Sequence, residues 1–213
     1  MQIGIIGAGR IGGNIARLLV AAGHDVLVSY SRDEQELQGR AATIGAKAGS
    51  VAEAAQFGTV IVLSVPWPNI DQVLGEAGSL ASKIVIDTTN HYERGGIAGL
   101  TDRTAAQVNQ ARMPGALLVK AYNTLTAQFQ ADAAGRQGPD RVVMFLCGDD
   151  GEAKAVVSRL IEETGFAPFD VGGLADAAVM EAPRREGAVY GEEFHLAEAE
   201  RFFHAGAQDE GEL

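Results

Sequence analysis

The chain has 213 residues, of which 46% are hydrophobic and 21% are charged, values typical of one globular domain with a small additional lobe. The net charge of −11 argues against nucleic acid as a partner, and no apolar stretch reaches the ~20 residues of a membrane-spanning helix. The single cysteine, Cys147, excludes an internal disulfide. Because a predicted strand begins almost at the first residue, without the pattern of a signal peptide, we expect a cytoplasmic protein.

Apolar runs alternate along the chain with amphipathic segments, which predicts a repeating order of strand and helix. The apolar runs are continuous, as in strands covered on both faces, and this indicates a parallel sheet between two layers of helices. Strands are predicted at residues 3–6, 25–30, 60–65, 84–86, 117–121, 142–146 and 166–171. Helices are predicted at residues 10–22, 33–42, 50–56, 68–81, 102–113, 151–164 and 193–204.

These elements predict an α/β protein with a doubly wound, mostly parallel Rossmann sheet of about seven or eight strands over residues 1–173. Residues 174–213 are expected to form a small C-terminal lobe. The predicted helix of this lobe either packs its apolar face on the same chain or buries that face in a homodimer. The apolar face carries Leu196, Ala199, Phe202 and Phe203.

A glycine motif joins the first predicted strand to the first predicted helix, where residues 7–12 read GAGRIG. In this pattern Gly7 permits a tight turn, Gly9 lets the backbone approach a pyrophosphate, and Gly12 lets the helix pack closely on the strand. The helix N-terminus offers free N–H groups and a partial positive charge to the anion, and Arg10 adds a cation. The motif therefore predicts a dinucleotide site.

The residues after the second strand distinguish NADP from NAD. An acidic residue about 20 positions past the glycines binds the ribose 2′-hydroxyl of NAD, whereas an arginine accepts the 2′-phosphate of NADP. Arg32 occupies that place here, and Ser31 precedes it. A guanidinium group forms charge-assisted bonds to phosphate, and a hydroxyl can donate as well. The sequence therefore predicts NADP as the cofactor.

Ligands of such sheets lie beyond the carboxyl ends of the strands, so residues that follow strands are candidates for the site. Ser64, Val65, Pro66 and Trp67 follow one strand, and the prolines make a rigid turn with an apolar face suited to a nicotinamide ring. Polar residues follow two further strands, and Asn123 is among the candidates there.

His91, Tyr122 and Thr124 are the candidate proton donors or acceptors at these strand ends. The sequence shows no Tyr-x-x-x-Lys pair, no Cys–His pair placed for nucleophilic catalysis and no spacing for a metal site. A reaction that demands little of protein side chains fits best. Hydride transfer between two bound cofactors is such a reaction, because orientation provides most of the catalysis.

Six stretches of the sequence together carry a resemblance to a known family. They are GIIGAGRIGGNIA at 4–16, SR at 31–32, VLSVPWPNIDQVL at 62–74, KIVIDTTN at 83–90, VKAYNTL at 119–125 and FLCGDDGEAKAVVSRLI at 145–161. Together they resemble the NADPH:coenzyme F420 oxidoreductases, also called F420-dependent NADP reductases. A similar domain occurs in the cytosolic part of the ferric-reductase family, which passes electrons from NADPH to flavin.

The resemblance implies an NADP-binding domain, a small C-terminal lobe, and a cleft in which a deazaflavin lies against the nicotinamide. Hydride would pass between nicotinamide C4 and deazaflavin C5. Carried over by position, Gly9, Arg10 and Ile11 would contact the pyrophosphate, and Ser31 and Arg32 the 2′-phosphate. The nicotinamide end would be lined by Val65, Pro66, Trp67 and Asn123.

The chain departs from this family in two segments. Residues 87–91 are polar where the family often carries an apolar stretch with proline, and residues 182–191 differ from the apolar helix expected over the deazaflavin. These differences leave the hydride acceptor open.

Three functions are consistent with the sequence. The leading one is an NADPH-dependent oxidoreductase that passes hydride to or from a flavin-like acceptor, either coenzyme F420 or an ordinary flavin. The second is an NADPH-dependent reductase of a small carbonyl or imine, which requires a proton donor in the cleft. The third is a non-catalytic NADP-binding sensor. None of the three involves a metal site, nucleic acid or a membrane.

Overall fold

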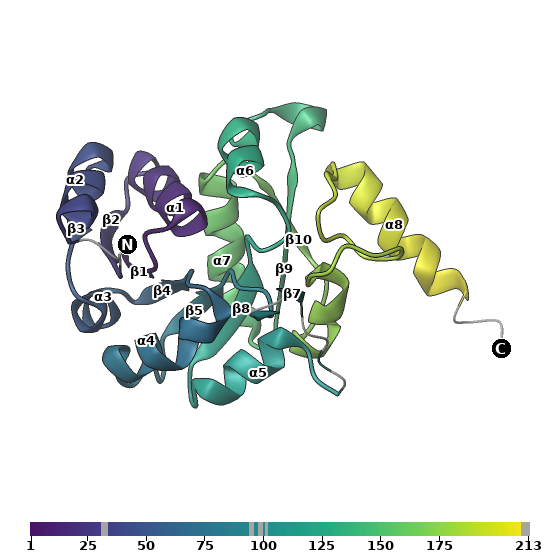
Figure 1. Ribbon diagram of the computed structural model, residues 1–213. Coiled ribbons are helices and arrows are strands. Elements are labelled where there is room, and N and C mark those ends of the chain that lie inside the picture. The colour runs from purple at the N-terminus through teal and green to yellow at the C-terminus, as the bar shows by residue number, and fades with distance from the viewer. Residues whose placement is uncertain (31–33, 94–95, 98–99, 101, 210–213) are drawn as a thin grey trace.

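A sheet of eight strands forms the centre of the computed structural model, which describes residues 1–30, 34–93, 96–97, 100 and 102–209. The strand order is β10-β9-β8-β5-β4-β1-β2-β3, and helices cover both faces (Figure 1). Neighbouring strands pair in parallel except β8 and β9, which are antiparallel. The strands are β1 (Gln2–Ile6), β2 (Asp25–Ser29), β3 (Lys47–Ala48), β4 (Val60–Leu63), β5 (Ile84–Asp87), β8 (Leu117–Ala121), β9 (Val143–Gly148) and β10 (Ala167–Asp170). The predicted Rossmann architecture is thereby confirmed.

The helices follow the strands in the predicted alternation. They are α1 (Arg10–Ala21), α2 (Glu34–Ile44), α3 (Val51–Phe57), α4 (Ile70–Ala77), α5 (Ala105–Arg112), α6 (Ala127–Ala133), α7 (Gly151–Glu163) and α8 (Leu196–Asp209), with 3-10 turns η1 (Trp67–Asn69), η2 (Gly138–Asp140) and η3 (Leu174–Met180). Strand β3, helix α6 and the hairpin of β6 (Tyr92–Glu93) and β7 (Gly96–Ile97) were not predicted.

Helix α4 is shorter than the sequence predicts. Pro68 lies inside the 3-10 turn η1, and α4 begins only at Ile70. The helix ends before Gly78, whose φ of 72° lies in the left-handed region that glycine adopts readily. Proline and glycine thus set the two ends of this helix, as their backbone preferences require.

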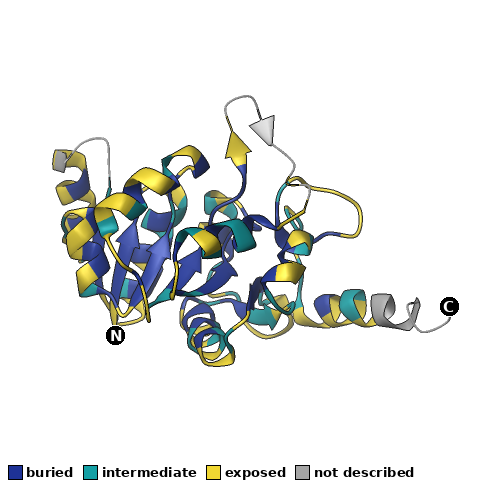
Figure 2. Cartoon of the chain, turned by 90° about the horizontal axis from the view of Figure 1, so that it is seen from below, coloured by how far each residue is buried: buried dark blue, intermediate teal, exposed yellow. Residues whose placement is uncertain are grey.

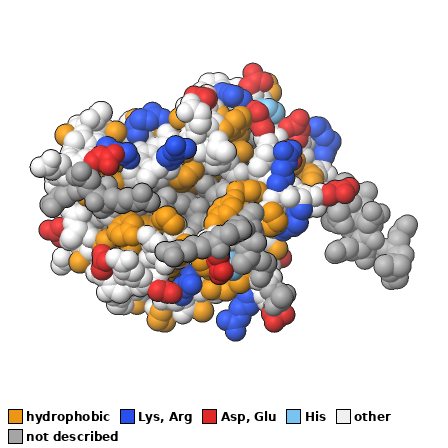
Figure 3. Space-filling view, viewed as in Figure 1, with side chains coloured by type: hydrophobic (Ala, Val, Ile, Leu, Met, Phe, Trp, Pro, Cys, Tyr) orange, Lys and Arg blue, Asp and Glu red, His pale blue; other side chains and the backbone are white. Residues whose placement is uncertain are grey.

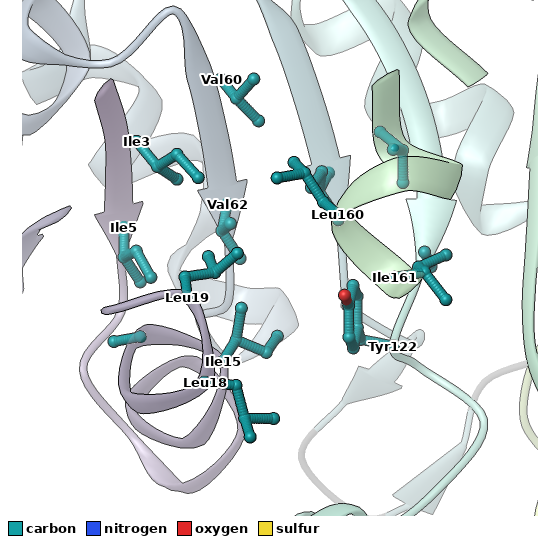
Figure 4. Close-up of a cluster of buried hydrophobic side chains, with 14 of the residues drawn as sticks. Ile3, Ile5, Ile15, Leu18, Leu19, Val60, Val62, Tyr122, Leu160 and Ile161 are labelled. Atoms are coloured by element: carbon teal, nitrogen blue, oxygen red, sulfur yellow. The ribbon is translucent and has the colours of Figure 1, made fainter. Parts of the chain in front are cut away.

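Two apolar clusters cover the two faces of the sheet. On one face, Ile15 and Leu19 of α1 pack with Ile3 and Ile5 of β1 and with Val62 of β4 (Figure 4). Figure 2 shows the strands as the buried centre of the molecule. Continuous apolar strands are therefore buried on both sides, which is the reason for the pattern seen in the sequence.

The C-terminal segment packs on the second face of the same sheet. Leu174 and Met180 of η3, Val189, and Ala199 of α8 belong to the apolar cluster of that face. Phe202 and Phe203 extend the packing, since Phe203 contacts the ring of Phe145 at a centroid distance of 6.0 Å. Ala199, Phe202 and Phe203 of α8 thus pack on their own chain, whereas Leu196 is 46% exposed, and α8 extends away from the body (Figure 1). Among the described residues, no helix is both long enough and apolar enough to cross a membrane.

The topology brings particular strand ends together. Strand β1 lies between β2 and β4, so the chain order reverses there. In open α/β sheets, ligands bind at such a reversal, beyond the carboxyl ends of the strands. The loops after β1, β4, β5 and β8 are therefore the elements that position a site.

Candidate functional site

The glycine loop is built around two close backbone contacts and one open position. A Cβ atom at Gly7, whose φ is 114°, would lie 2.1 Å from the carbonyl oxygen of Ser64. One at Gly12 would lie 2.0 Å from the carbonyl oxygen of Gly7. One at Gly9 would meet no atom within 4 Å. Gly7 and Gly12 therefore serve the packing of the loop, and Gly9 faces open space.

The N-terminus of α1 is available for an anion. Gly9 is its N-cap residue and supplies no side-chain cap, and no acidic residue lies in the first turn. The first amide groups of a helix have no partner within the helix, and the helix dipole adds a partial positive charge. A phosphate group in the open space at Gly9 would meet both.

Two hollows meet at this loop. The α1–α2 hollow has a volume of about 680 Å³ and is lined by Arg10, Arg17 and Arg40 together with neighbouring residues of α1 and α2. The central cleft has a volume of about 700 Å³ and lies over the ends of β4, β5 and β8. Gly9 and Arg10 line both. On the face shown in Figure 3, hydrophobic side chains gather near the middle and Lys and Arg side chains border them.

Most of the predicted site residues come together in the central cleft. Its lining includes Gly9, Arg10, Ile11, Ser64, Val65, Pro66, Trp67, Tyr122, Asn123 and Thr124. Gly7 and Gly12 do not line the cleft and instead allow the close packing of the loop. Ser31 and Arg32 lie outside the residues that the structure describes. His91 is not among the residues that line the cleft.

Asn123 presents a fixed acceptor in the cleft. Its Nδ2 donates to the carbonyl oxygen of Met180 at 2.6 Å and to Asn90 Oδ1 at 3.3 Å. Because both partners are acceptors, the orientation of the amide is determined. Asn123 Oδ1 and Thr124 Oγ1 are buried and have no hydrogen-bond partner among the described residues. A buried polar atom without a partner is costly, so a ligand that donates to Asn123 Oδ1 would bind favourably.

A buried ionic cluster lies behind the cleft. Lys120 Nζ is 3.1 Å from Asp87 Oδ2, 3.6 Å from Glu181 Oε1 and 2.8 Å from the carbonyl oxygen of Thr89. Asp87 also accepts from Asn109 Nδ2 at 3.0 Å. Burial lowers the pKa of Lys120, but the two carboxylates outweigh that effect and the pKa is raised. Lys120 is thus held charged.

This cluster was missed in the sequence, although a lysine inside an otherwise apolar strand is a visible signal. Glu181 also accepts from the amide nitrogens of Ala105 and Ala106, both at 2.8 Å, at the start of α5. The cluster therefore ties the loop after β5 and the segment before residue 182 to the sheet. Asp87 faces this interior cluster and not a substrate.

The three candidate acids are placed differently. His91 Nε2 lies 2.9 Å from Glu93 Oε1, and its ring packs on Trp67 at a centroid distance of 4.7 Å. The hydroxyl of Tyr122 shares a hydrogen bond of 2.7 Å with Thr164 Oγ1, and burial raises the pKa of Tyr122. Its hydroxyl therefore points away from the cleft into the core. Within the described part of the chain, Thr124 Oγ1 and His91 Nδ1 are buried without a hydrogen-bond partner.

Trp67 is held between two side chains. The guanidinium carbon of Arg112 lies 4.6 Å from the ring centroid of Trp67, in addition to the contact with His91. Arg112 is fixed in turn by Asp71 at 3.0 Å and by Asn109 Oδ1 at 2.9 Å. His91 therefore supports one wall of the cleft.

Two tyrosines in the cleft were not identified from the sequence. Tyr92 of β6 and Tyr190 of the segment 182–191 both line the cleft, and their hydroxyl groups share a hydrogen bond. Arg184 of the same segment also lines it and pairs with Glu192. The sequence marked 182–191 as unusual, but nothing local indicates that it meets a residue 98 positions earlier.

Known proteins resemble the chain over most of its length. Residues 2–91 match the family model described as NADP oxidoreductase, coenzyme F420-dependent. Metalloreductase STEAP3 of Rattus norvegicus is 32% identical over 182 residues, which are 85% of this chain. The chain spans only 36% of that protein's length.

Solved structures agree with this assignment. The hypothetical protein SMa0349 from Sinorhizobium meliloti is 30% identical, with a TM-score of 0.82 and coverage of 92% of this chain and 95% of that one. A protein from Arthrobacter sp. FB24, described as a candidate F420-dependent NADP-reductase, is 25% identical with a TM-score of 0.72, covering 83% and 87%. A reductive aminase from Aspergillus terreus, at 20% identity and a TM-score of 0.62 over 83% and 57%, shares the fold. Residues 2–91 therefore match the family described as NADP oxidoreductase, coenzyme F420-dependent, and the solved structures extend the similarity over most of the chain.

Proposed function

We propose that this protein binds NADPH across the glycine loop and transfers hydride between the nicotinamide and a flavin-like acceptor, either the deazaflavin coenzyme F420 or an ordinary flavin. One observation carries the proposal: the two hollows meet at Gly9 and Arg10. A dinucleotide has two halves joined by a pyrophosphate, and two hollows joined at an anion-binding loop match that shape.

Each part of the cofactor has a candidate group of residues in this chain. Gly9, Arg10 and Ile11 would hold the pyrophosphate, and Ser31 and Arg32 would hold the 2′-phosphate. Arg17 and Arg40 line the α1–α2 hollow, where Arg40 also pairs with Glu36. Arg40 is fixed there by a bond of 3.0 Å to the carbonyl oxygen of Ala8.

In the central cleft, Val65, Pro66 and Trp67 would form the apolar wall beside the nicotinamide ring, with Ser64 at the start of the turn. Asn123 Oδ1 would accept from the carboxamide N–H group, which would satisfy the buried acceptor. Bound NADPH supplies the hydride and its electron pair. The protein side chains orient the ring and exclude water, and orientation accounts for much of the barrier reduction in such reactions.

The choice of a flavin-like acceptor is supported by the relatives. The matching family model and the Arthrobacter protein are both described by coenzyme F420. STEAP3 is a metalloreductase, of which the chain matches a part. A second candidate, a reductase of a small carbonyl or imine, is favoured by the hydroxyl groups of Tyr92 and Tyr190 in the cleft.

An acceptor screen tests the proposal. The binding of NADPH would be measured by its fluorescence, and its oxidation would then be followed with F420, FMN, FAD, ferricyanide, a cyclic imine and a small ketone. Turnover with F420 or a flavin supports the proposal. Turnover limited to the imine or ketone would establish the second candidate instead. Tight binding without turnover of any acceptor would identify a sensor and refute both enzymatic proposals.

A further inference from the structure

We infer that Tyr190 is the proton donor of the central cleft and that Tyr92 connects it to solvent. This inference rests on the proposed hydride transfer and names a catalytic residue for it. It concerns acceptors that must gain a proton as well as a hydride, namely a conjugated C=N or C=O group in a flavin-like ring or in a smaller molecule.

The composition of the cleft leaves few candidates. Among the described residues that line it, the titratable side chains are Arg10, Tyr92, Tyr122, Arg184 and Tyr190. Arginine side chains stay protonated in proteins and do not exchange protons at neutral pH. The hydroxyl of Tyr122 is engaged by Thr164 in the core. Tyr92 and Tyr190 remain, and their hydroxyl groups are bonded to each other.

Tyr190 is held next to the polar end of the cleft. The amide nitrogen of Gly191 donates to the carbonyl oxygen of Thr124 at 2.9 Å, and that of Val189 donates to the carbonyl oxygen of Val179 at 2.8 Å. These two main-chain bonds flank Tyr190 on either side in the sequence. They hold its main chain near Thr124, and Tyr190 lines the same cleft as Asn123 and Thr124, whose unpartnered oxygens mark the place for a ligand. A catalytic acid needs this kind of fixed position.

Tyr92 is more exposed to solvent than Tyr190. Its side chain belongs to the β6–β7 hairpin and is 42% exposed, whereas Tyr190 is partly buried. In a bonded pair of phenols one hydroxyl donates to the other, so the accepting hydroxyl keeps its own proton free for a third group. The pair therefore joins a fixed inner hydroxyl to an outer one that reaches water.

The hydroxyl of Tyr190 carries a proton that it can donate. Burial raises the pKa of Tyr190, so the phenol is protonated throughout the neutral range. Hydride transfer to one atom of the conjugated group leaves an electron pair on its heteroatom. Tyr190 donates its hydroxyl proton there, so its O–H bond breaks as an N–H or O–H bond forms. Tyr92 then returns a proton to the phenolate and takes one from water. The two electrons come from NADPH, the reductant of the proposed function.

Kinetics of three forms provide the first test. Wild type, Tyr190→Phe and Tyr92→Phe would be compared with F420 and FMN as acceptors, and NADPH affinity would be measured separately. We expect Tyr190→Phe to lower kcat about 100-fold or more without changing NADPH affinity. Tyr92→Phe should lower it less, because water can partly replace the outer hydroxyl.

The pH profile separates an acid from a structural residue. The wild-type rate should be independent of pH through the neutral range, because the donor stays protonated. In Tyr190→Phe the proton has to come from solvent, so the residual rate should fall as pH rises. A merely structural role would lower the rate equally at every pH, and that result, like full activity of Tyr190→Phe, would overturn the inference.

A binding experiment tests the placement without any acceptor. The chain has four tyrosines, so labelling each phenolic carbon with ¹³C gives four resonances that single Phe substitutions can assign. NADP⁺ should shift the Tyr190 and Tyr92 resonances, whereas 2′-phospho-ADP-ribose, which lacks the nicotinamide, should not. Tyr122, whose hydroxyl is bonded to Thr164 in the core, should move less than these two. If NADP⁺ binds and these two resonances do not move, the inference fails alone; if NADP⁺ does not bind, the proposed function fails and takes the inference with it.

Discussion

Lys120 and Asp87 form a salt bridge in the interior of the protein, with 3.1 Å between Nζ and Oδ2 and neither side chain exposed to solvent. The bridge joins the end of β5 to β8, the two neighbouring strands whose following loops carry Asn90 and Asn123. Asn90 Nδ2 in turn donates to the carbonyl oxygen of Asn123 at 3.0 Å. The wall of the cleft therefore depends on an ionic group that itself never meets a ligand.

Removing the buried charge should destabilise the fold. We expect Lys120→Met to lower the free energy of unfolding by about 3–5 kcal/mol, because Asp87 and Glu181 would be left as buried carboxylates without their cation. Denaturant titration measures the loss. Lys47→Met provides the control, since its bridge to Asp25 is about half exposed and should contribute about 1 kcal/mol or less. Equal losses in both variants would contradict this role of Lys120.

Substitutions at two glycines of the loop should affect NADPH binding and protein stability separately. Gly9→Ala adds a methyl group into open space, so the protein should fold normally but bind NADPH about tenfold more weakly or worse, a loss of about 1.4 kcal/mol. Gly12→Ala drives a methyl group against the carbonyl oxygen of Gly7 and should cost about 1–3 kcal/mol of stability. Isothermal titration and thermal unfolding of both variants provide the measurements. Unchanged NADPH affinity in Gly9→Ala would argue against a pyrophosphate at this loop.

Arg32 should determine the preference for NADP. A charge-assisted hydrogen bond contributes roughly 1.5–3 kcal/mol, which corresponds to about one to two decades in affinity. Arg32→Ala should therefore raise KM for NADPH about ten- to a hundredfold and leave KM for NADH nearly unchanged. Arg159→Ala, an exposed arginine on α7, provides the matched control. An equal change for both cofactors would refute the assignment.

The start of α3 should make stability depend on pH. Glu53 Oε2 accepts from the backbone nitrogen of Ser50 at 2.7 Å and from its hydroxyl at 2.9 Å, and these bonds lower the pKa of Glu53 below 4.5. A lowered pKa contributes stability that is present above the unfolded value and lost as pH falls through the folded one. Glu53→Gln should thus be less stable than wild type at pH 7, with the difference disappearing in acid. A difference that is independent of pH would exclude the carboxylate as its source.

Local patterns predicted the parts of the protein that are set by local chemistry. Continuous apolar runs marked the main strands because both faces of the sheet are buried, and GAGRIG marked the turn that only glycine permits at Gly7 and Gly12. The short elements were missed because they carry too little local pattern. Helix α6, with the sequence AQFQADA, has too few apolar positions to show a helical period, and β3 has two residues.

The sequence by itself determined the Rossmann sheet, the dinucleotide motif and most of the residues that meet in the central cleft, because the alternation of strands and helices and the glycine turns follow from short-range preferences. Only the tertiary structure decided which polar groups face the central cleft. It turned the hydroxyl of Tyr122 to Thr164 in the core and placed His91 behind Trp67. It paired Tyr92 with Tyr190 across 98 positions of the chain. Burial and pairing of such groups arise from contacts between distant segments, which no local pattern encodes.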